Sequence, residues 1–375
     1  MCGFHRRSRA KSLVCQINGL IEARVWNKIV EDYVMTISKL AFVTTSMLLA
    51  SCLVMSAVAP ASAAEPGGKP EKSDVVVTYA QPSGAFTPIW VAYEAGLFRK
   101  YGLNAQLQLL TPQVSAQAVV SEEADFYTDG PDLINARLRG GQVKYFAGTI
   151  QQLVFEIWGA KEIKTIRDLK GKTVAASTPR AALDTATREA LRKNGLVPDK
   201  DVQILYVQTV PAILSSILGG KTAAGTLSAP NTLKAKESGL NLLLDIGKLN
   251  IPAFQVAYGT TEKYLKNNPN TVYAFLMAIA EGVVLSRKDA GVAKKAIAKY
   301  AKIDDPPTVD GTYEAFAPYW AMSLAVRAEA IKGQFDYLDD KEFPNAKNAD
   351  PRDFYDNSFV DALTKSGFLK SLGMK

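Results

Sequence analysis

Histidine and cysteine are almost missing from this sequence, which has one histidine and three cysteines in 375 residues. All four, His5, Cys2, Cys15 and Cys52, lie near the N-terminus. A mature chain that begins near Glu65 would therefore contain neither residue type. Such a chain cannot form disulfide bonds, a thiol nucleophile, a Ser-His-Asp triad or the common zinc sites made of His or Cys.

Strong charge of one sign is also lacking. The formal net charge is +7, but the first 64 residues hold seven basic and three acidic residues. The remainder has 37 basic and 34 acidic residues, a net charge of +3. No basic run is interleaved with aromatic residues, so we expect no nucleic-acid partner. No Walker, HExxH or paired-acid motif is present, so neither ATP binding nor a metal or other cofactor is expected.

The N-terminal region contains a pattern typical of a secretory signal that begins at Met35. Lys39 supplies the positive charge, residues 40–58 are mostly apolar, and residues 61–64 are the small residues that signal peptidase needs. We predict a signal peptide at 35–64, preceded by an upstream extension at 1–34 that is not part of the fold. Two alternatives stay open: a membrane anchor, and a lipoprotein cleavage box at 49–52 that would leave Cys52 lipidated.

The stretch from Val75 to Leu103 contains a strand, turn and helix pattern that recurs along the rest of the chain. Residues 75–79 are β-branched and aromatic, which predicts a buried strand. After a turn, Thr87 and Pro88 suit the start of a helix over 88–101. The free N–H groups of that helix would then lie at the carboxyl end of the strand, where open α/β sheets bind ligands.

The same strand, turn, proline and helix order returns three times, with prolines at 131, 179 and 230. Proline is common at the first turn of a helix, so a single case carries little weight. Four cases together predict helix N-termini directed at one cleft.

The order of elements predicts two similar α/β units and a helical tail. In the first unit, strands at 75–79, 105–110, 124–127 and 143–149 alternate with helices at 88–101, 113–121 and 131–139. In the second, strands at 172–177, 202–207, 223–228 and 240–245 alternate with helices at 179–194, 211–219 and 230–238. A strand at 254–260 would return the chain to the first unit, and helices follow from 269, including one at 307–337.

We therefore divide the chain into a first lobe that begins with 65–158, a second lobe at 159–250, and a return at 251–375 that adds the C-terminal helices. The crossings are expected near 158–165 and 248–256. Two lobes with two crossings fit a binding protein that closes over its ligand by hinge motion.

Several segments resemble bacterial ABC-transporter substrate-binding proteins of the nitrate, sulfonate, taurine and bicarbonate type, which share a fold with thiamine-pyrimidine synthases. The ordered pieces are 88–103, 124–126, 139–143, 168–174, 191–196, Pro230 and 268–269. The similarity covers about 74–370. Two departures, Glu123 where the family usually has Gly and Ala223-Ala224 where it usually has Asp-Ala, weaken any transfer of ligand identity.

The resemblance implies an α/β, two-lobed periplasmic-binding-protein fold, type II-like, in which each lobe is a sheet flanked by helices. It also implies a monomer in the periplasm that delivers a small anionic or zwitterionic molecule to a membrane permease with its cytoplasmic ATPase. A ligand-binding sensor is the first alternative. A pyrimidine-synthase-like enzyme is the second, although fungal-type members use a histidine and a cysteine-rich motif that the mature chain lacks.

By the same resemblance the ligand should lie between the lobes, against the turns that follow the strands. Two charged candidates leave alternatives open. Arg180 suits an acid group or lies solvated on the surface, and Asp129 caps a helix or pairs with an amine on the ligand. The full set of candidate ligand-binding residues is Gln81, Ser83, Phe86, Thr87, Tyr127, Thr128, Asp129, Thr178, Arg180 and Asn231.

Overall fold

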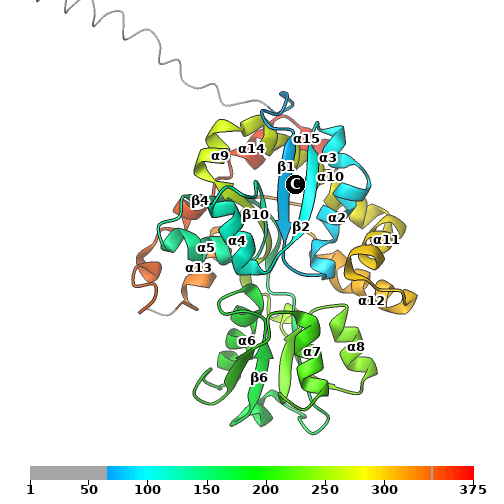
Figure 1. Cartoon of the computed structure of the whole chain (residues 1–375), viewed down its shortest axis with the longest axis vertical. Coiled ribbons are helices and arrows are strands. Elements are labelled where there is room, and N and C mark those ends of the chain that lie inside the picture. The colour runs from blue at the N-terminus through cyan, green and yellow to red at the C-terminus, as the bar shows by residue number, and fades with distance from the viewer. Residues whose placement is uncertain (1–65, 339–340) are drawn as a thin grey trace, which may run out of the picture. The chain divides into compact units, whose positions relative to one another are not determined.

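The computed structural model describes residues 66–338 and 341–375. The predicted upstream extension, the signal peptide and Cys52 lie outside the described residues. The described strands form two lobes, each with its own sheet and helices (Figure 1). This confirms the predicted α/β fold.

The first lobe contains β1 (Asp74–Tyr79), β2 (Asn104–Leu109), β3 (Tyr127–Asp129), β4 (Val143–Gln152) and β10 (Pro252–Thr261). β1 and β2 are parallel, and a parallel bridge between Val77 and Phe126 joins them to the β3-β10-β4 sheet. β10 is antiparallel to both of its neighbours. The strand order of this lobe is therefore β2-β1-β3-β10-β4.

The second lobe contains β5 (Glu156–Gly159), β6 (Thr173–Ala176), β7 (Gln203–Tyr206), β8 (Ala224–Leu227) and β9 (Asn241–Asp245). Its order is β7-β6-β8-β5-β9, with β6 parallel to β7 and β8, and β5 antiparallel to its neighbours. The two lobes thus share one topology. In each, the antiparallel fourth strand is the one that has just crossed from the other lobe.

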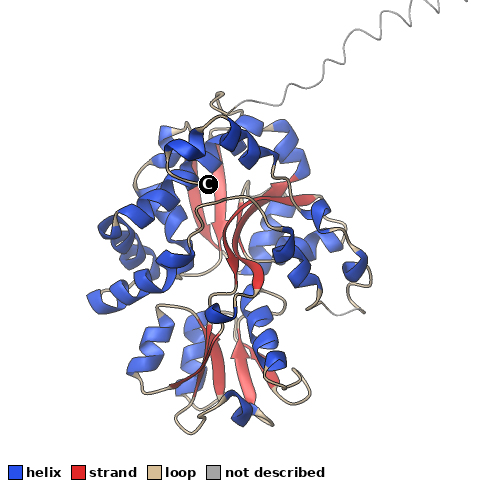
Figure 2. Ribbon diagram, turned by 180° about the vertical axis from the view of Figure 1, so that it is seen from behind, coloured by secondary structure: helices blue, strands red, loops and turns tan. Residues whose placement is uncertain are grey.

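The helices lie around these sheets (Figure 2). In the first lobe they are α2 (Thr87–Glu94), α3 (Leu97–Lys100), α4 (Pro112–Val120) and α5 (Asp132–Leu138); in the second, α6 (Ala182–Lys193), α7 (Val210–Leu218) and α8 (Asn231–Glu237). The C-terminal part adds α9 (Glu262–Asn267), α10 (Pro269–Lys288), α11 (Ala290–Ala301), α12 (Pro306–Phe316), α13 (Ala328–Phe335), α14 (Ser358–Lys365) and α15 (Phe368–Ser371).

Two predicted helices are divided in the structure. The helix expected at 88–101 is α2 and α3, because Gly96 between them has φ +69°, a left-handed conformation that glycine adopts readily. The helix expected at 307–337 is α12 and α13. A short 3-10 turn at Ala317–Tyr319, which contains a proline, follows α12 and stops it.

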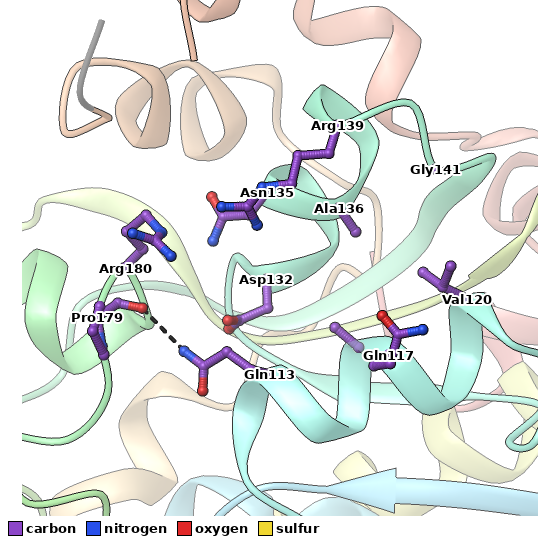
Figure 3. Close-up of a pocket in the computed structure, with 11 residues that line it drawn as sticks. Gln113, Gln117, Val120, Asp132, Asn135, Ala136, Arg139, Gly141, Pro179 and Arg180 are labelled. Carbon is purple, nitrogen blue, oxygen red and sulfur yellow. Dashed lines mark hydrogen bonds between the residues drawn. The ribbon is translucent and has the colours of Figure 1, made fainter. Parts of the chain in front are cut away.

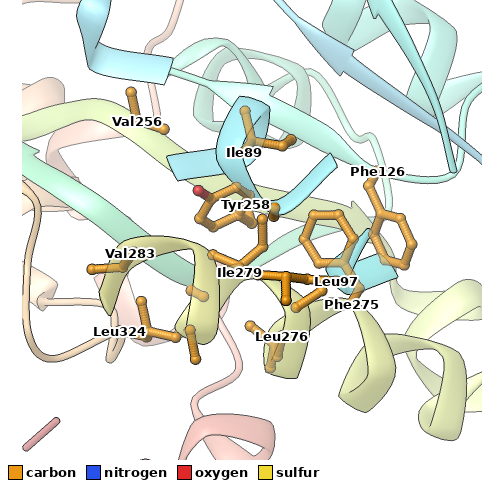
Figure 4. Close-up of a cluster of buried hydrophobic side chains, with 14 of the residues drawn as sticks. Ile89, Leu97, Phe126, Val256, Tyr258, Phe275, Leu276, Ile279, Val283 and Leu324 are labelled. Atoms are coloured by element: carbon orange, nitrogen blue, oxygen red, sulfur yellow. The ribbon is translucent and has the colours of Figure 1, made fainter. Parts of the chain in front are cut away.

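Helix α10 lies at the centre of the first lobe's core. Its Phe275 ring stacks on Phe126 with centroids 4.1 Å apart and meets Phe98 at 5.6 Å (Figure 4). Of the described helices, α10 is also the one long and apolar enough to cross a membrane, yet most of it is buried inside this core. The core position accounts for its apolar composition.

The chain passes between the lobes twice, through residues 153–155 and 246–251. The first passage comes earlier than expected: residues 156–158, assigned above to the first lobe, belong to β5 in the second sheet. The run 151–158 contains no glycine, proline or other turn signal, which hides this break. Residues 158–165, where the first crossing was expected, lie instead within the second lobe.

The two passages are hydrogen-bonded to each other. Leu153 N–H donates to Ile251 O at 3.2 Å, and Ile246 N–H donates to Phe155 O at 2.9 Å. The Gln255 side chain holds Val154 from both sides, accepting from its N–H at 2.6 Å and donating to its carbonyl at 3.2 Å. Motion of one lobe against the other must therefore bend these two hydrogen-bonded segments.

Candidate functional site

A small cavity of about 40 Å³ lies where the two lobes meet. We call it the inner cavity. The first lobe contributes Gln81, Ser83 and Asp129, which follow or end β1 and β3, and the second contributes Ser177 and Ser228, which follow β6 and β8. These are the carboxyl ends of strands that are parallel within each lobe, the edge at which α/β sheets bind ligands.

Helix N-termini from both lobes surround the inner cavity. Its lining includes Phe86 before α2, Pro112 at the start of α4, Ala182 at the start of α6 and Val210 at the start of α7. In α6 the N–H groups of Ala182 and Leu183 donate no hydrogen bond within the described part of the chain, and Ala181 offers no side-chain cap. Such N–H groups carry partial positive charge. The described lining has no lysine or arginine, so the helix ends are its source of positive potential.

Buried polar atoms without partners gather at the same strand ends. Gln81 Oε1 and Asp129 Oδ2 belong to lining residues. Thr128 Oγ1 and Thr178 Oγ1 belong to the residues next to the lining residues Asp129 and Ser177 in the chain. None of these atoms has a hydrogen-bond partner among the described residues. Each costs about 1–3 kcal/mol when left unpaired in the interior. A cluster of this kind is expected where a ligand supplies the missing partners.

Two buried carboxyl groups, Asp129 and Asp132, lie next to each other at the end of β3 and the start of α5. Burial raises the pKa of Asp129 well above its ordinary value, and the charge of Asp132 raises it further. Burial also raises the pKa of Asp132 to about 7, opposed by the hydroxyl of Tyr127 and the charge of Arg180. Like charges in a dry site cannot both ionise easily. Each of the two carboxyl groups therefore favours its protonated form more than an exposed aspartate does.

The lobes touch directly beside the inner cavity. Ser83 Oγ lies 3.3 Å from Ser228 Oγ and donates to Ala229 O at 3.3 Å. Gly130 faces the start of α6 so closely that a Cβ atom there would lie 3.0 Å from Ala182 Cβ. These contacts belong to a closed arrangement of the lobes.

A larger pocket of about 300 Å³ also lies between the lobes, and we call it the outer pocket (Figure 3). It lies between α4 and α5 of the first lobe and Pro179 and Arg180 of the second. Gln113 Nε2 donates to Pro179 O at 3.0 Å across this junction. Asp132 lines the outer pocket, three residues after Asp129, which lines the inner cavity.

Arg180 lines the outer pocket and is absent from the lining of the inner cavity. Its backbone has φ +66°, and its N–H donates to Asp184 Oδ2 at 2.7 Å. Its Nη1 donates to Glu342 Oε2 at 2.9 Å, and Arg139 binds the other oxygen of the same carboxylate. Arg180 thus shares a pocket with Asp132, and the other charged candidate, Asp129, lines the inner cavity instead.

The structure brings four of the ten candidate residues to the inner cavity: Gln81, Ser83, Phe86 and Asp129. The other uncharged candidates are buried nearby without lining it: Thr87, Tyr127, Thr128, Thr178 and Asn231. Thr87 Oγ1, for example, donates to Gly84 O at 2.7 Å, a local role at a helix start.

Several lining residues were missed. Ser177 and Ser228 immediately precede the proline-containing turns at 178–179 and 229–230, so their position in the sequence is a usable signal. Phe155 and Gln255 belong to the crossings, where no local pattern distinguishes a lining residue from a core residue. Within the described residues there is no group of three or more His, Cys, Asp or Glu suited to a metal ion.

Comparison with known proteins connects this geometry to a family. The family model described as NMT1/THI5 like matches residues 83–290, more than half of the chain, beginning at Ser83 in the inner cavity. The chain belongs to the NMT1/THI5-like family. A search of curated protein sequences found no match to this NMT1/THI5-like protein.

Solved structures share the NMT1/THI5-like protein's fold at low sequence identity. The periplasmic nitrate-binding protein NrtA from Synechocystis PCC 6803 is 15% identical with a TM-score of 0.67, over 80% of this chain and 90% of that chain. The alkanesulfonate-binding protein SsuA from Xanthomonas axonopodis pv. citri, bound to MOPS, is 18% identical with a TM-score of 0.61, over 80% and 98%. A cysteine-to-serine variant of DszB in complex with biphenyl-2-sulfinic acid is 14% identical with a TM-score of 0.57, over 78% and 100%.

Proposed function

We propose that this protein is the solute-binding component of an ABC importer. It captures a small organic molecule in the periplasm and delivers it to a membrane permease that a cytoplasmic ATPase drives. The observation that carries the proposal is the inner cavity, at which both lobes present strand ends, helix N-termini and buried polar atoms without partners. Nitrate-binding and alkanesulfonate-binding proteins among the structural neighbours support it.

The ligand class follows from the charges at the junction. The N–H groups at the start of α6 suit an acidic or oxygen-rich group. Asp129 and Asp132 suit a hydrogen-bond donor, which an uncharged or ammonium group provides. Together they favour a zwitterionic solute over a simple anion. No catalytic role is proposed, since the described residues include no histidine or cysteine.

Capture requires the lobes to move about the two passages at 153–155 and 246–251. In the closed arrangement Ser83 meets Ser228 and Gly130 meets Ala182, so a solute at the junction is enclosed on both sides. Opening breaks these contacts but leaves both sheets intact, because every ladder pairs strands within one lobe. In this motion the first lobe, together with the C-terminal return, is one rigid body and the second lobe is the other.

A thermal-shift screen of the purified protein tests the proposal. Sulfonates, nitrate, bicarbonate, aromatic carboxylates, amino acids and pyrimidines form the panel. A solute present at 100 times its Kd should stabilise the folded state by about 2.7 kcal/mol and raise the Tm. Gln81→Leu should reduce that shift, because Gln81 Oε1 lies unpartnered at the inner cavity. The matched variant Gln106→Leu, on the exposed side of β2, should retain it. A panel that produces no shift, or a shift that Gln81→Leu leaves intact, would count against the proposal.

A further inference from the structure

The outer pocket is lined by hydrogen-bond acceptors, one of which has no partner among the described residues. Asp132 and Asn135 lie one helical turn apart on α5, and each is only 4% exposed. Both line the outer pocket, and Figure 3 places them beside the Arg180 side chain. Asn135 Oδ1 is buried and has no hydrogen-bond partner among the described residues. A buried amide oxygen in that state is stabilised by any donor that enters the pocket.

The cations of the outer pocket, by contrast, are already paired. Glu342 accepts hydrogen bonds from both Arg139 and Arg180, one on each carboxylate oxygen. The two guanidinium groups also lie over the Phe343 ring, 4.7 Å and 6.0 Å from its centroid. An acid group on a ligand would have to compete with Glu342 for these arginines.

Gln113 adds a third acceptor to the same wall. Its Nε2 is used in the hydrogen bond to Pro179 O, which leaves its Oε1 to accept. The outer pocket can therefore accept hydrogen bonds from a group that has several N–H donors. A primary ammonium has three such donors and a charge opposite to that of an ionised Asp132.

We propose that the outer pocket is an ammonium subsite, in which Asp132 and Asn135 receive the protonated amine of the captured solute. Its volume of about 300 Å³ lies at the lower end of the range for small-molecule sites, whereas the inner cavity of about 40 Å³ has room for only a few atoms. The inference rests on the proposed function, because both spaces lie at the junction of the lobes. The acidic end of the solute then lies toward the N-terminus of α6.

Isothermal titration calorimetry at pH 8 with three probes tests this subsite. They are 3-aminopropane-1-sulfonate, propane-1-sulfonate and propylammonium, which carry both groups, the acid alone and the amine alone. The probe with both groups should bind about tenfold or more tightly than propane-1-sulfonate. Equal or tighter binding of propane-1-sulfonate, or no binding of any probe, overturns the subsite.

Two variants test whether the preference for the ammonium-bearing probe arises in the outer pocket. Asp132→Asn and Asn135→Leu should each reduce the preference for the ammonium-bearing probe to about twofold or less. Asn348→Leu, an exposed asparagine outside the pocket, should keep it. Two variants are needed because Asn135→Leu changes a buried position, and a preference that both leave intact overturns the subsite.

The two proposals fail in different ways. If solutes without an amine bind and Gln81→Leu removes that binding, the solute-binding function stands and the ammonium subsite is wrong. If neither the three probes nor the solutes of the thermal-shift panel bind, both are wrong.

Discussion

Replacing Asp132 with asparagine should stabilise the protein at pH 8 by on the order of 3–4 kcal/mol. Burial raises the pKa of Asp132 from 3.8 to about 7, so the folded chain holds at pH 8 a carboxylate that it accommodates poorly. Asparagine has nearly the same shape and no charge. For a domain of this size the gain corresponds to a rise in Tm of roughly 5–10 °C.

The pH dependence of this effect has a definite sign. Between about pH 4 and pH 7 the folded chain keeps the Asp132 proton while the unfolded chain loses it. Rising pH through that interval therefore lowers the free energy of unfolding of the wild type. The groups that lower the pKa of Asp132 include Arg180, through its charge, and Tyr127, whose hydroxyl oxygen lies 3.5 Å from Asp132 Oδ2. The stabilisation by asparagine should thus be small at pH 4.5 and full at pH 8.

Thermal melts of both proteins across that pH range provide the measurement. Asp184→Asn is the matched comparison, because Asp184 is also a buried aspartate but has partners. Its carboxylate accepts from Arg180 N–H at 2.7 Å, Arg188 Nε at 3.0 Å and the Tyr206 hydroxyl at 3.1 Å. Weakening these three hydrogen bonds by replacing the carboxylate with an amide should destabilise the protein. If Asp132→Asn were also destabilising at pH 8, Asp132 would be held by Arg180 as a structural ion pair.

A stabilising substitution at this position is what a binding role for Asp132 implies. A carboxylate whose burial outweighs the help of its neighbours Tyr127 and Arg180 lowers stability at pH 8 unless another selective advantage retains it. The proposed ammonium group supplies a further partner. The same change that raises the Tm should therefore weaken the preference for the amine-bearing probe, and a structural role for Asp132 would not produce both effects.

The repeated strand, turn and helix units were predictable because their signals are local. Thr87 and Pro88 mark the start of α2, and Gly195 ends the turn after α6, each within a few residues of the feature it controls. Gln81, Ser83 and Asp129 follow from the same logic, since a residue after a parallel strand lies at the ligand-binding edge.

The direction of Arg180 could not be predicted in this way. It depends on a left-handed backbone at Arg180 itself and on Glu342, which lies 162 residues away along the chain. The proposed role of Asp132 was not predicted, for a related reason. It follows a strand and opens a helix, where an acid normally stabilises the helix dipole. Only the packing of Tyr127 and Tyr145 around it shows that this carboxyl is buried.

Gly130→Val should weaken solute binding roughly 10- to 100-fold by keeping the lobes apart. A Cβ atom at Gly130 would lie 3.0 Å from Ala182 Cβ in the other lobe and 3.2 Å from Phe254 O. The backbone cannot shift easily, because Tyr145 and Tyr127 donate to Gly130 O at 2.7 Å and 3.3 Å. The extra methyl groups of valine must therefore displace α6.

Small-angle scattering and calorimetry together separate closure from folding. Gly130→Val should retain its secondary structure, show a larger radius of gyration in the presence of solute, and bind that solute weakly. Gly291→Val, at an exposed position in α11, should behave as the wild type. Because Phe254 belongs to the first lobe, some cost falls on the open form as well, and a lower Tm alone does not demonstrate blocked closure. Normal affinity in a folded Gly130→Val protein would mean that the contact between Gly130 and Ala182 is not required for capture, and that the solute is held within one lobe.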